Sequence, residues 1–219
     1  MLIAAETPRF VWYLMRGSGF VALILCSLTV LLGIVGVTRL HSPRWPRLVT
    51  GDLHRTVALS ATCFLGLHIL MALIDGWVGL GWIGAVVPFH ATYRPLWVGA
   101  GVVAFDVLLA VVASSLLRRR IGARLWRLIH WGTWVVWPMA VVHALGSGTD
   151  STNGWGLGVV LLCVGAVGAA AIWRVRFALG KPAQPPGGRP STTPVPPLPV
   201  DGAGTPMHEQ APRRVPARV

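Results

Sequence analysis

The most regular feature of this sequence is a series of long apolar runs separated by short polar segments. The runs occupy residues 19–38, 55–75, 96–117, 126–146 and 156–178. Each is long enough to form a helix that crosses the hydrocarbon core of a bilayer, which takes about 20 residues. The pattern therefore predicts an all-α fold, a polytopic transmembrane helical bundle with about five spans.

Composition places the chain in a membrane. Hydrophobic residues make up 54% of the sequence and charged residues 12%, and the mean hydropathy is +0.64. A soluble domain of this composition would lack the polar residues needed to cover its surface. The net charge of +12 comes from 19 basic residues, all but one of them Arg, which cluster between the apolar runs rather than on one polar face. We therefore expect a lipid bilayer as the partner and no nucleic acid.

The distribution of the basic residues predicts the orientation of the chain, because Lys and Arg in short loops favour the cytoplasmic side. The segments after the first, third and fifth runs are rich in Arg, whereas the second loop has only Arg94 and the fourth has none. We expect a multi-pass plasma-membrane protein with its N-terminus outside and its C-terminus in the cytoplasm. Residues 1–18 would then be extracytoplasmic, 19–180 the transmembrane bundle, and 181–219 a disordered Pro-rich tail.

Four histidines belong to two of the predicted spans, where an ionisable side chain is costly. His54 and His68 belong to the second span, and His130 and His143 to the fourth. One crossing separates these spans, so they run parallel, and each begins near an Arg-rich face. At about 1.5 Å of rise per residue, separations of 14 and 13 residues put the second histidines about 20 Å deeper. His54 should therefore lie level with His130, and His68 with His143.

Two imidazoles at equal depth on facing helices are what a six-coordinate b-type haem requires, because its iron takes one nitrogen from each side of the porphyrin. Two levels predict two stacked b-type haems between spans two and four, with the four histidines as axial iron ligands. Fourteen residues return to nearly the same helix face, but thirteen miss it by about 140°. We attribute the correction in span four to Pro138, since an interior proline kinks a helix.

Charged residues near the histidines are candidates for further roles. Basic side chains at the inner face suit the propionates of the inner haem, and three are candidates: Arg55, Arg124 and Arg127. Anchoring of the helices at the membrane face is their alternative role. Near the outer face, Arg94 with Tyr93 and His90 is a candidate for the outer propionates or for an approaching acceptor. Asp106, in the middle of span three, is interpreted as an inter-helix hydrogen-bonding group or, alternatively, a proton relay.

The LHR at 53–55, the two histidine spacings and the W-x3-H-W at 126–131 carry a resemblance to a known family. Over about 18–178 the chain resembles the ferric reductase-like transmembrane superfamily, which includes ferric reductases, the membrane half of NADPH oxidases and the haem subunit of the methionine-sulfoxide reductase system. Members usually have six spans, so a flanking helix is absent here or the apolar loop 77–95 replaces part of it. No flavin and nicotinamide module follows, so the resemblance implies an oxidoreductase component whose donor is another molecule.

The function expected from these residues and this resemblance is electron transfer across the membrane. The donor would be a cytoplasmic flavin reductase or quinol, and the acceptor would be external ferric iron, oxygen or a partner reductase. One alternative is a quinol-linked cytochrome b subunit of a larger complex, which would have its own quinone pocket. A second is a haem-free membrane metal transporter or scaffold that uses the histidines as metal ligands, although such transporters usually contain broken helices and acidic ligands near the midplane.

Overall fold

The computed structural model describes residues 9–38, 47–76, 78–148 and 154–179, and all the regular secondary structure in these ranges is helical. Four helices are long and apolar enough to cross a membrane: α1 (Arg9–Thr38), α2 (Arg47–Ile74), α4 (Pro95–Leu116) and α7 (Gly154–Leu179). A fifth crossing results if α5 (Arg118–His130) and α6 (Thr133–Ser147) form one bent span. The chain is therefore a multi-pass membrane protein with four or five spans.

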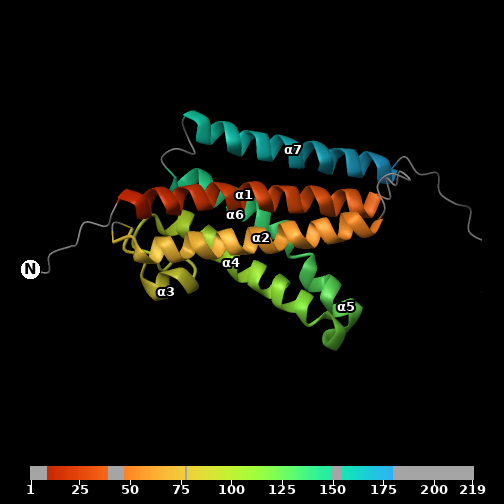
Figure 1. The fold of residues 1–219 in the computed structure, drawn as a ribbon, viewed down its shortest axis with the longest axis horizontal. Coiled ribbons are helices and arrows are strands. Elements are labelled where there is room, and N and C mark those ends of the chain that lie inside the picture. The colour runs from red at the N-terminus through yellow and green to blue at the C-terminus, as the bar shows by residue number, and fades with distance from the viewer. Residues whose placement is uncertain (1–8, 39–46, 77, 149–153, 180–219) are drawn as a thin grey trace, which may run out of the picture. The chain divides into compact units, whose positions relative to one another are not determined.

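The helices pack as two close pairs joined by α1. Figure 1 shows α1 between α7 and α2, and α1 also contacts α6, while α4 packs along α6. A shared core connects α1, α6 and α7, with Leu23, Val141 and Val160 buried together. The indole Nε1 of Trp137 on α6 donates a hydrogen bond to Ser27 Oγ on α1 at 2.9 Å. Such small-residue contacts and inter-helix hydrogen bonds hold helices together where lipid removes the usual hydrophobic driving force.

Large apolar side chains cover the outside of this bundle. Leu116 on α4 is 72% exposed and Leu162 on α7 is 73% exposed. In water a surface of this kind would be unfavourable, whereas in a bilayer the lipid chains cover it. The exposure pattern agrees with the membrane location that the composition predicts.

Helix α1 begins earlier than the apolar run from which we expected it. The run starts at residue 19, whereas the helix starts at Arg9 and includes Arg16. Arginine is a good helix former, and its long side chain can lie along an apolar surface, so neither residue ends the helix. The expected tail at 181–219 and residues 1–8 lie outside the described residues.

The fourth predicted span is broken just after its first histidine. α5 ends at His130, and α5 and α6 meet at a bend of 44° across Trp131 and Gly132. A Cβ on Gly132 would lie 2.9 Å from the Ile129 carbonyl oxygen, so only glycine fits this turn closely. α6 continues through Pro138 without a break. The change of direction between the two histidines therefore lies at residues 131–132, whereas we expected it at the proline.

The apolar loop between the second and third spans contains one short helix, α3 (Gly81–Val86), and no additional crossing among the residues described there. Gly84 and Ala85 of α3 are buried, while Trp82 is 76% exposed. The loop ends at Arg94, which has a left-handed backbone (φ 42°) and precedes the first turn of α4. The loop therefore packs against the end of the bundle at which α4 begins.

Candidate functional site

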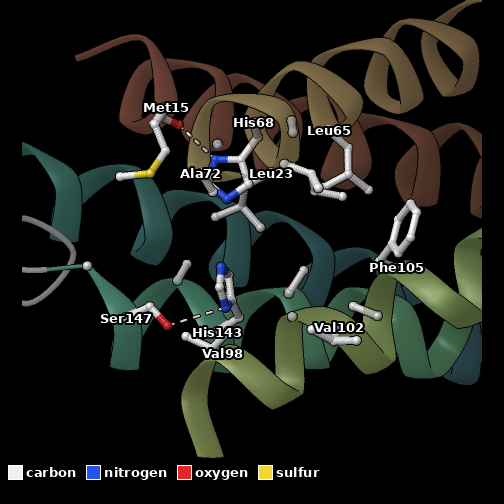
Figure 2. Close-up of a pocket in the computed structure, with 18 of the residues that line it drawn as sticks. Met15, Leu23, Leu65, His68, Ala72, Val98, Val102, Phe105, His143 and Ser147 are labelled. Carbon is white, nitrogen blue, oxygen red and sulfur yellow. Dashed lines mark hydrogen bonds between the residues drawn. The ribbon is translucent and has the colours of Figure 1, made fainter. Parts of the chain in front are cut away.

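The four histidines of the spans form two facing pairs. The ring centres of His54 and His130 are 6.4 Å apart, and those of His68 and His143 are 6.1 Å apart. α2 packs on α1 and α6 packs on α4, so the two histidine-bearing helices are not themselves a packed pair. Figure 2 shows the imidazoles of His68 and His143 pointing toward one another across the space between them. The structure thus brings together the two pairs that the helix rise predicts.

These separations fit two imidazoles that share one metal ion. A metal binds an imidazole nitrogen at about 2 Å, and that nitrogen lies about 1 Å from the ring centre, so the two ring centres are about 6 Å apart. A free metal ion usually needs three or four protein ligands, and the described part of the chain holds no such cluster of His, Cys, Asp or Glu. Two ligands are enough for a haem iron, because the porphyrin supplies the other four.

Three of the four imidazoles donate a hydrogen bond through Nδ1 to a backbone carbonyl of the neighbouring helix. The pairs are His54 with Thr29 at 3.1 Å, His68 with Met15 at 2.7 Å and His143 with Trp97 at 3.0 Å. A carbonyl oxygen can only accept, so Nδ1 carries the proton and Nε2 of the neutral ring keeps its lone pair. In the second pair Nε2 is the nitrogen directed at the opposite ring (Figure 2). This tautomer is ready to bind a metal.

His130 is held differently from the other three histidines. Its Nδ1 atom is buried and has no hydrogen-bond partner among the described residues. The ring stacks on Trp126, with centres 5.0 Å apart and planes 26° apart. The guanidinium of Arg118 lies 4.1 Å from the centre of the Trp126 ring on which His130 stacks. A stacking contact therefore replaces the backbone hydrogen bond at this position.

A cavity of about 350 Å³ surrounds the His68 and His143 pair. Its wall is mainly apolar and includes these residues (Figure 2): Leu23, Leu65, Ala72, Val98, Val102 and Phe105. Arg16 and Tyr93 also line it and add a cationic group and a phenol. An apolar pocket with a basic side chain at its wall suits a large apolar group that carries carboxylates. Asp106 is half-buried on α4 and is not among the residues that line this cavity.

Arg16 is a site residue that the sequence analysis missed. It precedes the first apolar run, so it was assigned to the segment before the bundle. Because α1 already begins at Arg9, Arg16 lies inside the helix, half-buried, with its guanidinium 4.5 Å from the centre of the Trp12 ring. The start of α1 could have been found from the apolar and aromatic residues of 10–15, which continue the run toward the N-terminus.

The basic residues named as propionate partners lie away from the rings of the pairs. All three inner candidates are exposed: Arg55, Arg124 and Arg127. At that level Arg118, through Trp126, is the arginine that contacts the site. Arg94 donates a hydrogen bond to the Gly146 carbonyl and so ties the start of α4 to the end of α6. His90 is exposed in the loop.

The comparisons with known proteins agree with this arrangement. The family model described as "Ferric reductase like transmembrane component" matches residues 18–141, more than half of the chain. The matched range includes His54, His68 and His130 and ends two residues before His143. No curated protein and no solved structure matches the chain.

Proposed function

Since this chain belongs to the ferric reductase-like transmembrane family, we propose that it carries electrons across the membrane through two b-type haems. Membership in the family indicates electron transfer in a membrane, and the histidine pairs supply the reason for two haems. His54 and His130 would be the axial ligands of one iron, and His68 and His143 those of the other. The observation that carries this proposal is the pair of ring separations, 6.4 Å and 6.1 Å.

A bound haem supplies an iron that gains and loses a single electron. The residues of the chain determine how it does so. Two histidines occupy both axial positions, which leaves the iron no open coordination site for a substrate. The apolar wall around His68 and His143, including Leu65 and Phe105, excludes water from that site. The low dielectric constant around the metal then strengthens the influence of nearby charges on its reduction potential.

The separation of the two pairs along the helix suits transfer between the two faces of a membrane. His54 and His68 are 14 residues apart on α2, which corresponds to about 20 Å of helix. The hydrocarbon core of a bilayer is about 30 Å thick. Two carriers at these levels would each lie within a few ångströms of one face, so a donor and an acceptor on opposite sides could both reach the chain.

Basic residues at each level support binding of the haem propionates. Arg16 lines the cavity around His68 and His143. At the other level, Arg118 stacks above Trp126, and the exposed set Arg55, Arg124 and Arg127 is available at the ends of the helices. Guanidinium groups bind carboxylates through paired, charge-assisted hydrogen bonds. We therefore assign Arg16 to the propionates of one haem and the α2 and α5 arginines to those of the other.

We assign the His54 and His130 level to the cytoplasmic side of the plasma membrane, because the Arg-rich α5 adjoins it. The N-terminus would then be outside and the C-terminus inside. Electrons would enter from a flavin reductase or from quinol at the cytoplasmic face. They would leave to ferric iron, oxygen or a partner reductase outside, from the level where Arg16 and Tyr93 line the cavity.

The proposal is tested by reduced-minus-oxidised spectra of the purified protein together with its haem stoichiometry. We expect two b-type haems per chain, and a chain without haem would overturn the proposal. Replacing His68 with Ala should remove one haem and leave the other. The matched control is His90→Ala, which changes an exposed loop histidine and should retain both. Retention of both haems in His68→Ala would contradict the ligand assignment.

A further inference from the structure

The three hydrogen bonds between imidazoles and carbonyls share one local arrangement in the accepting helix. In each case the residue four positions after the acceptor is glycine. The acceptors and their glycines are Met15 with Gly19, Thr29 with Gly33, and Trp97 with Gly101. On α1 the two arrangements are 14 residues apart, the same separation as His54 and His68 on the adjoining α2. The contact therefore repeats at both levels of the pair formed by α1 and α2.

Helix geometry gives the reason for a glycine at that position. The carbonyl of residue i accepts the N–H of residue i+4, and its oxygen has a second lone pair available for a side chain. A side chain at i+4 begins beside this oxygen and blocks the approach. A Cβ on Gly101 would lie 2.5 Å from His143 Nδ1, and one on Gly19 would lie 2.9 Å from His68 Nδ1. Neither imidazole could keep its present place beside such a Cβ.

The third glycine is less crowded. A Cβ on Gly33 would lie 3.6 Å from the His54 ring, at Cε1, which is an ordinary van der Waals distance. The three positions therefore form a graded series, in which Gly101 is the most closely approached and Gly33 the least.

The fourth histidine departs from the pattern at the position where the pattern would place its partner. A step of 14 residues along α4 from Trp97 and Gly101 leads to Val111 and Ser115. The hydroxyls of Ser115 and Ser114 donate to the Val111 carbonyl at 2.7 Å and 2.9 Å. The acceptor is therefore already engaged and lies beside a Cβ, and the buried Nδ1 of His130 has no hydrogen-bond partner in the described part of the chain.

We propose that Gly19, Gly33 and Gly101 are positioning residues for the axial histidines, and that Ser115 withholds the same contact from His130. This inference rests on the proposed function, because it concerns how those histidines hold iron. A hydrogen bond from Nδ1–H fixes the ring orientation and makes Nε2 more basic. A more basic ligand stabilises the ferric state, so each such bond lowers the reduction potential of its haem. The two levels are thereby made unequal, with two bonds at one and one at the other.

The first test removes the arrangement at the His68 and His143 level. Gly101→Ala should weaken haem binding at that level by about 10- to 100-fold, as the loss of outer contacts to a metal ligand typically does. Any haem retained there should have a higher potential and an altered low-spin electron paramagnetic resonance spectrum, because the ring turns. Gly19→Ala should do the same less strongly, and Gly33→Ala should have the smallest effect, at the other level. The control is Gly17→Ala on α1, where an added Cβ meets nothing within 4 Å.

The second test creates the missing arrangement. The double variant Ser114→Ala/Ser115→Gly removes both hydroxyls and the Cβ beside the Val111 carbonyl, so His130 Nδ1–H gains an acceptor. The potential of the His54 and His130 haem should fall and its resonance spectrum should shift. The matched control, Ser114→Ala/Ser115→Ala, also removes both hydroxyls but keeps the Cβ, so it should leave the potential higher than in the glycine variant.

These outcomes separate the present inference from the function on which it rests. A wild-type protein without haem overturns the proposed function. A wild-type protein with two haems, together with a Gly101→Ala variant of unchanged stoichiometry, potential and spectrum, overturns only the role of the glycines. If Gly101→Ala does not accumulate in the membrane, the two serine variants decide the question, and equal potentials in the pair would refute it.

Discussion

At the scale of single residues, the direction of a lone pair determines what a histidine can do. His143 Nδ1 lies 3.0 Å from the Trp97 carbonyl oxygen and 3.3 Å from Ser147 Oγ. Because the carbonyl takes the Nδ1 proton, the hydroxyl can share it only as a second, weaker acceptor. His68 is oriented in the same way by Met15 on a different helix. Two neighbouring helices therefore aim two lone pairs at one point between them.

Arg16 permits a test of charge at the cavity. Arg16→Gln keeps a long polar side chain but removes a positive charge from the wall around His68 and His143. A nearby cation favours the reduced iron, which has one positive charge fewer, so the substitution should lower the reduction potential of that haem. A potentiometric titration followed optically measures the change. The control is Arg9→Gln, at the exposed start of α1; equal potentials in wild type and Arg16→Gln would show that the guanidinium does not act on the haem.

At the scale of the elements, the break between α5 and α6 sets the position of one histidine relative to the other. The separation of 13 residues between His130 and His143 does not return to the same face of a straight helix. The bend at Trp131 and Gly132 removes this difficulty by changing the helix direction immediately after His130. The two imidazoles of this span can then both face α2.

The break is sensitive to the size of residue 132. In Gly132→Ala the added methyl would lie 2.9 Å from both the Ile129 carbonyl oxygen and Val107 Cγ1 of α4. We expect the unfolding free energy to fall by about 1–3 kcal/mol, the usual cost of overpacking. The haem at His130 should be lost at lower denaturant concentration than the haem at His143.

The matched control for this substitution is Gly158→Ala on α7, where a Cβ meets nothing within 4 Å. Alanine is the better helix former by about 1 kcal/mol, so this control should be neutral or slightly stabilising. If the two variants lose haem equally, the break at residue 132 does not position His130.

At the scale of the whole chain, the proposed orientation decides which way electrons move. His90→Cys introduces a thiol in the exposed loop between α2 and α4, and Arg119→Cys introduces one at the exposed start of α5. In intact cells a membrane-impermeant maleimide should label the first variant and leave the second unlabelled until the membrane is permeabilised. The expectation follows from the excess of Arg at the α4 to α5 junction. Labelling in the reverse order would invert the topology and with it the assignment of donor and acceptor sides.

The sequence by itself determined the number and order of the apolar helices, and it determined that the four histidines would lie at two levels. Both follow from local properties, because hydropathy is summed along the chain and the rise per residue is the same in every α-helix. The paired glycines could also have been noticed, since Gly19 and Gly33 repeat the 14-residue spacing of His54 and His68. Only the packing of α1 against α2 gives that spacing a meaning.

The tertiary structure alone decided which residues surround the histidines. Arg16 lines the cavity, while Arg94, which was expected there, holds the end of α6. The turn at Gly132 does what we had expected of Pro138. These outcomes depend on the rotation of each helix about its axis and on the identity of its neighbours. Both are set by side-chain contacts between segments far apart in sequence, which no local pattern records.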